Sequence, residues 1–329
     1  MINIPNFTDR CIKAIREKQT VLICGLDPQL RFMPPCLIKA AVTRFQRSYR
    51  AISELFFSFN RQIIDAVEPF IFAVKPQMAF YEAYGHWGMH AFERTVAYAH
   101  SKGLIVIEDA KRGDGGDTAD AYASGHIGKV DFFGEGDNLC AFTQQFSPVH
   151  VDCLTVQPGI GEDCVGRFVK AVKQHGTGIF VVTKSSFRPN SKVEQLETKA
   201  GRKVWEEIAS MVSEWGQDTE GKEGYRNVGV VMGATFPGDA PTMRKILPRA
   251  WFLIPGYGGQ GGTADEAVVG INEDGFGGGV NSSRALIYAF LKGQFVSVPE
   301  NFANAAEKAA RFSRNELNDA LRRANKFNY

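Results

Sequence analysis

Short runs of apolar residues recur along the chain and alternate with longer stretches whose apolar positions repeat at helical spacing. Runs of this length that are apolar throughout are typical of strands buried on both faces of a parallel sheet. We predict eight strands, at Val21–Gly25, Phe70–Lys75, Leu104–Asp109, Cys153–Val156, Ile179–Thr183, Val228–Met232, Trp251–Ile254 and Gly278–Val280. The amphipathic stretches between them predict helices at Phe57–Val67, Met89–Ser101, Gly166–His175, Gly201–Trp215, Ala240–Leu247 and Ser282–Lys292.

The alternation of strands and helices indicates a parallel sheet, because parallel neighbours are joined by helical crossovers. Eight such units predict an α/β fold of the (β/α)8 TIM barrel type, with residues 1–329 forming a single domain. The main alternative is an open, doubly wound sheet. The amphipathic segment Asn304–Lys326 is expected to be a helix that packs against the barrel. The longer connections are expected to be insertions into this one domain: Leu30–Arg50, Gly128–Pro148, Phe187–Lys199 and Thr219–Asn227.

Charged side chains follow two of the predicted strands. The third strand runs directly into Asp109, Lys111 and Asp114, and the second ends on Lys75. Because side chains alternate along an extended chain, Asp109 and Lys111 should point to the same face. Charged residues often do no more than solvate the end of a strand. Two strands that both end in this way, in a chain that also carries segments suited to binding phosphate, indicate a functional site instead.

Those segments follow the seventh and eighth predicted strands, where barrels commonly hold a phosphate. Pro255–Gly262 is rich in glycine, which lets backbone N–H groups approach an anion, and Gln260 adds an amide donor. Ser283 and Arg284 open a predicted helix, where an anion is favoured and a guanidinium can bind it bidentately. Asp27 follows the first strand and could accept hydrogen bonds from sugar hydroxyls, although an Asp–Pro turn is also an ordinary structural feature.

The charge balance and the cysteine content narrow the class of protein. With 38 basic and 36 acidic residues the net charge is +2, which gives no sign of general nucleic-acid binding. The six cysteines include no C-x-x-C pair, which favours a reduced, cytoplasmic chain without a metal site. The N-terminus has no signal-peptide pattern, and no apolar run is long enough to span a membrane. We therefore expect a small-molecule substrate and no nucleic-acid or membrane partner.

The charged strand ends and the two phosphate segments together resemble the orotidine 5'-phosphate decarboxylases, in particular their bacterial subgroup with longer chains. The D-x-K-x-x-D run of that family matches Asp109, Lys111 and Asp114, and its earlier lysine matches Lys75. The two phosphate segments also look like those of the subgroup, so the resemblance extends over nearly the whole chain. It implies a (β/α)8 barrel that acts as a homodimer, with active sites at the shared interface.

The resemblance also implies roles for individual residues. Asp114 would reach into the partner's site, and Thr118 would be a hydroxyl contributed by the partner. Asp27 would bind the ribose. A serine after the fifth strand would hydrogen-bond the pyrimidine. Ser185 and Ser186 are both available there, and we favour Ser186 because a basic residue precedes it by two places, as in the family.

The implied reaction is the conversion of orotidine 5'-monophosphate to UMP and carbon dioxide, the last step of de novo pyrimidine nucleotide synthesis, without a metal or a cofactor. Lys111 would stabilise and protonate a carbanion at C6, flanked by Asp109 and by the partner's Asp114. Lys75 would complete the charge network and contact the ribose. Two alternatives stay open. One is a metal-dependent sugar-phosphate decarboxylase or aldolase of the same barrel type, and the other is a nucleotide-binding protein without catalytic activity.

Overall fold

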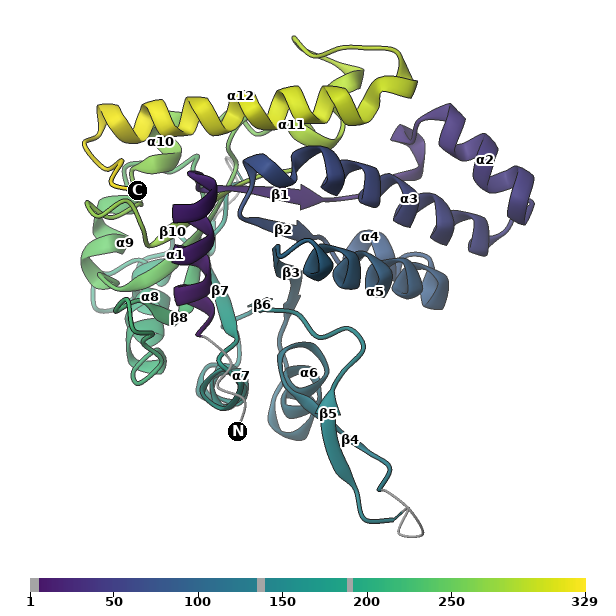
Figure 1. Ribbon diagram of the computed structural model, residues 1–329. Coiled ribbons are helices and arrows are strands. Elements are labelled where there is room, and N and C mark those ends of the chain that lie inside the picture. Colours follow the sequence, from purple (N-terminus) through teal and green to yellow (C-terminus); the bar gives the residue numbers. More distant parts are fainter. Residues whose placement is uncertain (1–5, 135–139, 188–191) are drawn as a thin grey trace.

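The computed structural model describes residues 6–134, 140–187 and 192–329, and at its centre is a closed barrel of eight parallel strands (Figure 1). The strands are β1 (Leu22–Leu26), β2 (Ala73–Pro76), β3 (Ile105–Arg112), β6 (Cys153–Val156), β7 (Gly178–Lys184), β8 (Arg226–Met232), β9 (Ala250–Pro255) and β10 (Gly278–Ser282). Each strand pairs with the next along the chain, and β10 pairs with β1 in the register Leu22↔Val280, which closes the sheet. The prediction of a (β/α)8 barrel with these eight strands is confirmed.

Helices surround the barrel. They are α1 (Phe7–Lys18), α2 (Pro35–Phe45), α3 (Tyr49–Val67), α4 (Ala79–Glu82), α5 (Gly85–Ser101), α6 (Gly116–Ile127), α7 (Glu162–His175), α8 (Val204–Trp215), α9 (Ala240–Ile246), α10 (Ala264–Val268), α11 (Arg284–Ile287) and α12 (Phe302–Arg323). Single 3-10 turns are η1 (Leu30–Phe32), η2 (Glu68–Phe70), η3 (Ala289–Leu291) and η4 (Pro299–Asn301). Five of the predicted helices correspond to α3, α5, α7, α8 and α9. The predicted helix Ser282–Lys292 is too long, because α11 ends at Ile287 and only η3 follows.

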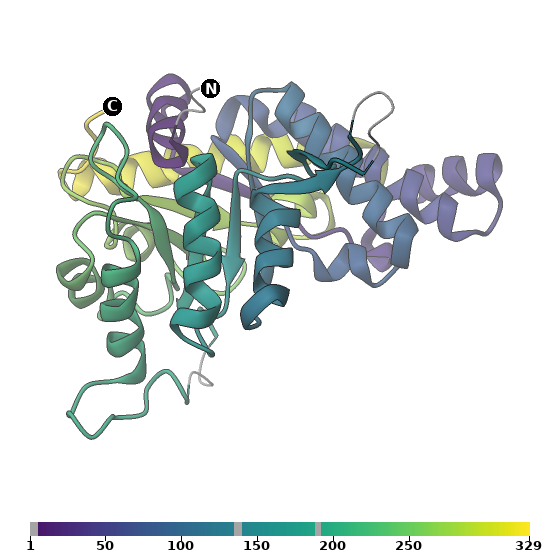
Figure 2. The ribbon, with the colours of Figure 1, turned by 90° about the horizontal axis from the view of Figure 1, so that it is seen from below.

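Three longer helices were not predicted from the sequence: α1, α2 and α6. The α2 helix lies inside the connection Leu30–Arg50, one of the predicted insertions. The α6 helix begins at Gly116 and contains Gly125, and each glycine in a helix costs about 1 kcal/mol relative to alanine. Tertiary packing offsets this cost, since α6 and α7 lie side by side on the outside of the barrel (Figure 2).

The connection Gly128–Pro148 contains an antiparallel hairpin of β4 (Lys129–Phe132) and β5 (Thr143–Phe146). The hairpin projects away from the barrel (Figure 1). Residues 135–139 of this connection, and residues 188–191 of the predicted insertion Phe187–Lys199, lie outside the described residues.

The predicted C-terminal helix is present as α12 and packs against α3, α10 and α11 (yellow in Figure 1). Its buried positions, among them Ala305, Ala309 and Leu317, lie on one side, as the amphipathic pattern predicted. None of the helices in the described part of the chain combines the length and the apolar character needed to cross a membrane.

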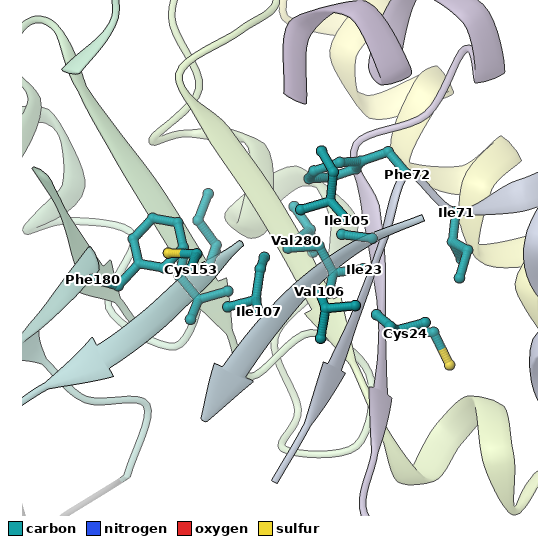
Figure 3. Packing of buried hydrophobic residues seen from close by; sticks show 14 of the residues in the cluster. Ile23, Cys24, Ile71, Phe72, Ile105, Val106, Ile107, Cys153, Phe180 and Val280 are labelled. Atoms are coloured by element: carbon teal, nitrogen blue, oxygen red, sulfur yellow. The ribbon is translucent and has the colours of Figure 1, made fainter. Parts of the chain in front are cut away.

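Large apolar side chains pack together in the core, as Figure 3 shows for residues of β1, β3, β6, β7 and β10 and for Ile71 and Phe72, which directly precede β2. Gly279 on β10 makes room for them: a Cβ there would lie 2.6 Å from Cδ1 of Ile23 and 2.8 Å from Cζ of Phe72. The α1 helix covers the amino-terminal end of the barrel, where the Phe7 ring meets the Phe180 ring edge-on at 6.0 Å. Because apolar side chains occupy this interior, polar side chains gather at the opposite, carboxyl-terminal end of the strands.

Candidate active site

A cavity of about 730 Å³ opens at the carboxyl-terminal ends of the barrel strands. Side chains reach it from the ends of β1, β2, β3, β7, β9 and β10. Those singled out from the sequence are Asp27, Lys75, Asp109, Lys111, Ser185, Ser186, Gln260, Ser283 and Arg284. Of the predicted site residues, only Asp114 and Thr118 do not line it. Parallel strands bring their carboxyl ends to one rim, and this is why residues separated by more than two hundred positions meet here.

Asp109 sits between two lysines. Lys75 Nζ donates to its Oδ2 at 2.8 Å, and Lys111 Nζ donates to its Oδ1 at 2.6 Å. Lys75 is 4% exposed and Asp109 is 8% exposed, whereas the Lys111 side chain is 40% exposed and faces the cavity. The buried pair therefore anchors the network, and Lys111 is the member that can approach a bound molecule.

The charges of these groups are coupled. Burial alone would raise the pKa of Asp109, but the ammonium groups of Lys75 and Lys111 outweigh it and hold the pKa well below its ordinary value. Burial likewise works to lower the pKa of Lys75, but the carboxylates of Asp109 and Asp27 outweigh it and raise the pKa. The site thus keeps a carboxylate and an ammonium charged although both are almost fully buried.

The backbone reaches this arrangement by an irregular route. Lys111 has φ +49°, in the left-handed region that a non-glycine residue adopts at a cost of about 1–2 kcal/mol. The pairing of β3 with β6 shifts between Glu108 and Arg112, so the strand bulges at the two site residues. Asp109 and Lys111 do share a face, as predicted, but the regular extended strand assumed in that prediction is wrong.

Two unpredicted polar residues hold the bulge in place. Thr155 Oγ1 accepts from the Lys111 backbone N–H at 2.9 Å and donates to Asp109 Oδ1 at 3.1 Å. Gln77 Nε2 donates to Asp109 Oδ2 at 3.0 Å. A weak sequence signal existed for both, since Thr155 is the polar residue of an apolar strand and Gln77 comes two places after Lys75.

Asp27 lies beside Lys75 and Asp109, and one of its carboxylate oxygens has no hydrogen-bond donor among the described residues. This oxygen, Oδ1, is buried. Burial raises the pKa of Asp27, against the opposing effect of the Lys75 ammonium. The turn is fixed by Tyr288, whose hydroxyl donates to the Asp27 carbonyl at 3.1 Å and accepts from the Gln29 N–H at 2.7 Å. A buried acceptor without a donor is costly, and a ligand hydroxyl would relieve that cost.

The proposed phosphate end is formed by the segments that follow β9 and β10. Gly256, Gly258 and Gly261 have φ of +105°, +71° and +89°, which lets the loop after β9 fold back on itself beside Gln260. Arg284 is exposed at the rim and makes no ion pair with the described residues. The α11 helix that it begins has only four residues, so the helix contributes less to anion binding than predicted.

The serines after β7 both line the cavity, and Ser186 is the more deeply set at 6% exposed. Thr235 Oγ1 donates to the Ser186 carbonyl at 3.0 Å. In contrast, Asp114 accepts from the N–H of Gly115 at 2.8 Å and stays outside the cavity, and Thr118 is exposed on α6. Within one chain the structure therefore brings together eight of the ten predicted site residues.

Comparison with known proteins identifies the family to which this chain is similar. A family model described as "Orotidine 5'-phosphate decarboxylase / HUMPS family" matches residues 22–289. The orotidine 5'-phosphate decarboxylase of Caldicellulosiruptor saccharolyticus is 34% identical over 316 residues, which are 96% of this chain and 99% of the relative. That of Rhodopirellula baltica is 34% identical over 311 residues, or 94% and 98% of the two chains.

Solved structures agree in fold. The Leishmania donovani OMP decarboxylase superposes with a TM-score of 0.69 at 24% identity, over 96% of this chain and 98% of that one. The family model and the full-length curated relatives settle the assignment. The chain belongs to the orotidine 5'-phosphate decarboxylase / HUMPS family.

Proposed function

We propose that this chain converts orotidine 5'-monophosphate to UMP and carbon dioxide in the cavity described above, with Lys111 as the proton donor. Family membership makes it a carboxy-lyase of pyrimidine biosynthesis. The observation that carries the residue assignments is the charged row of Lys75, Asp109 and Lys111, which shares one cavity with Arg284.

The chemical difficulty lies in the carbanion that remains at C6 of the pyrimidine when carbon dioxide departs. Preorganised charge is the general means of stabilising such a centre, because a fixed ammonium needs no reorganisation as the negative charge develops. Lys111 meets this requirement, because its Nζ is held by Asp109 Oδ1 at 2.6 Å and its exposed side chain lines the cavity. The same ammonium then delivers its proton to C6.

The rest of the nucleotide would be held by the other cavity residues. The Oδ1 of Asp27, which has no partner among the described residues, accepts from a ribose hydroxyl, and Ser186 hydrogen-bonds the pyrimidine. Gln260, Ser283 and Arg284 bind the phosphate. Binding energy gained at the phosphate can be used to exclude water and to orient the reacting carbon, so it is expected to increase kcat/KM.

A homodimer in which Asp114 and Thr118 complete the site of the partner is also part of the proposal. The match of Asp114 to the D-x-K-x-x-D run supports such a dimer. So does the position of Asp114 and Thr118 outside the cavity of their own chain. Hybrid dimers test it. A mixture of the Lys111→Ala and Asp114→Ala chains would regain roughly a quarter of wild-type activity, because half of the dimers would carry one intact site. Two inactive chains that stay inactive when mixed would contradict a shared site.

We further propose that the chain works as a single catalytic domain and that it works in the cytoplasm. The cytoplasmic location is supported by the six cysteines, all of which are described and unpaired, among them the exposed Cys140.

The decisive experiment is a direct assay with orotidine 5'-monophosphate, followed by the loss of its ultraviolet absorbance. Wild-type protein should turn the substrate over, and Lys111→Ala should be folded but inactive. Substantial decarboxylation by Lys111→Ala would reject Lys111 as the proton donor. Treatment with a chelator distinguishes the proposed reaction from that of a metal-dependent sugar-phosphate enzyme. Removal of the metal would stop the latter, whereas pyrimidine decarboxylation would continue.

A further inference from the structure

A fully buried lysine directly precedes the serines of the proposed pyrimidine site in the chain. Lys184 is the last residue of β7, and its side chain has no exposed surface. Lysine is rarely buried to this extent, because removing an ammonium from water is costly unless opposite charges surround it. Lys184 does not line the cavity, and neither the reaction nor substrate binding as described above uses it.

Two carboxylates from different connections face the ammonium. Lys184 Nζ lies 3.6 Å from Glu194 Oε2, in the connection between β7 and α8, and 3.8 Å from Asp239 Oδ2, at the start of α9. The ring of Phe236 covers it, with its centroid 4.0 Å from Nζ. These distances are longer than a hydrogen bond, and Nζ has no hydrogen-bond partner among the described residues. The ammonium thus acts as a buried charge shared between two loops.

Glu194 connects this charge to the cavity. While its Oε2 faces Lys184, its Oε1 accepts from the backbone N–H of Ser185 at 3.0 Å. The Glu194 carbonyl accepts from the N–H of Trp205 at 3.1 Å, which fixes the loop to the first turn of α8. The position of Ser185 therefore depends on where Lys184 holds the Glu194 carboxylate.

The loop that follows β8 also binds this segment, through hydrogen bonds to the backbone carbonyls of Lys184 and Ser186. The Gly233 N–H donates to the Lys184 carbonyl at 2.9 Å, and Thr235 Oγ1 donates to the Ser186 carbonyl. A Cβ at Gly233 would lie 2.6 Å from the Ser186 Cα, so the two segments are in close contact. Asp239 follows in this second loop and brings it to the ammonium.

We propose that Lys184 is a positioning residue for the pyrimidine: its ammonium binds Glu194 and Asp239 together and thereby sets Ser185 and Ser186 against the base. The inference rests on the proposed function, because it assumes a nucleotide whose base lies over these serines. Burial lowers the pKa of Lys184 despite both carboxylates, which agrees with a charge held in place at a cost.

The test compares ligands with and without the base. In Lys184→Met, the methionine preserves most of the volume and removes the charge. The affinity for UMP should fall about 10-fold, while that for ribose 5-phosphate stays within about two-fold, because only the base contacts are displaced. kcat/KM for orotidine 5'-monophosphate should fall about 10- to 100-fold, the range expected when a reacting group is misplaced by up to about 1 Å.

Lys326→Met is the matched control. Lys326 is also largely buried, and its Nζ donates to the carbonyls of Val269 and Ile271, on segments that precede β10 and lie at the opposite end of the barrel. Its replacement should lower the melting temperature and leave both affinities unchanged. Equal losses of UMP and ribose 5-phosphate affinity in Lys184→Met, or no loss of either, would overturn the proposal.

Glu194→Gln keeps the test decisive if Lys184→Met does not fold. It preserves an acceptor for the Ser185 N–H and removes only one of the two negative charges that Lys184 faces. It should reduce UMP affinity selectively as well. The double variant Lys184→Met/Glu194→Gln should lose no more UMP affinity than Lys184→Met alone, and additive losses would show that the two residues act independently. Failure of the wild-type protein to decarboxylate its substrate would instead refute the proposed function itself.

Discussion

The Asp109→Asn variant tests whether the row of Lys75, Asp109 and Lys111 that lines the cavity is held together by its central carboxylate. Asparagine has the same shape but no charge, so Lys75 would remain buried without its ion-pair partner. Breaking a buried pair from one side typically costs about 3–5 kcal/mol, whereas a contact as exposed as that of Lys111 contributes about 0–1 kcal/mol. Because Lys75 is 4% exposed and Asp27 retains some attraction for it, we expect the free energy of unfolding to fall by about 3 kcal/mol at neutral pH.

The pH dependence gives this prediction a second, independent part. The folded-state pKa of Asp109 lies below that of the unfolded chain, which is about 3.9. The stabilisation is therefore fully present above the pKa of the unfolded chain. It is lost as the pH falls towards the lower pKa of the folded state, where the folded protein also binds the proton. Asparagine does not titrate, so the difference between wild type and Asp109→Asn should shrink on going from pH 7 towards about pH 3.

Urea unfolding followed by tryptophan fluorescence measures both quantities. Lys111→Met serves as the comparison, because it should change the free energy of unfolding by less than about 1 kcal/mol while abolishing turnover. A loss below about 1 kcal/mol for Asp109→Asn at neutral pH, or a loss that is the same at about pH 3, would refute the reasoning.

Three further predictions concern other parts of the molecule. Arg284→Ala should lower kcat/KM by at least about 100-fold in steady-state assays, because this rim guanidinium, which has no ion-pair partner among the described residues, is assigned to the phosphate; a change of only a few-fold would contradict that role. Asp27→Asn should raise the free energy of unfolding of the ligand-free protein above about pH 5, because burial raises the pKa of this carboxyl and its ionisation costs stability. The variant should also bind UMP more weakly. Urea titrations that show a less stable variant would contradict the prediction. Arg244→Lys should destabilise the barrel by about 2–4 kcal/mol without changing kcat, because the guanidinium donates to four backbone carbonyls at the amino-terminal end; unchanged thermal unfolding would argue against it.

The apolar pattern determined the barrel and the approximate position of the site. Strands that are buried on both faces are apolar throughout, so their ends are marked where charged residues begin, as at Lys75 and Asp109. In a parallel barrel all carboxyl ends meet at one rim, so the order of strands along the chain was enough to place Asp27, Gln260 and Arg284 in the same cavity.

The tertiary structure decided the geometry within that rim. The left-handed backbone at Lys111 and the support from Thr155 depend on the pairing of β3 with β6, a contact between residues far apart in the sequence. The α6 helix, which starts with a glycine, is stabilised by packing on α7 and not by local propensity. Lys184 appears in the sequence as an ordinary charged strand end, and only the folding of two loops over it turns it into a buried charge. Local sequence determines what each residue prefers by itself, whereas burial, pKa and contact distance are set by neighbours that only the closed barrel brings together.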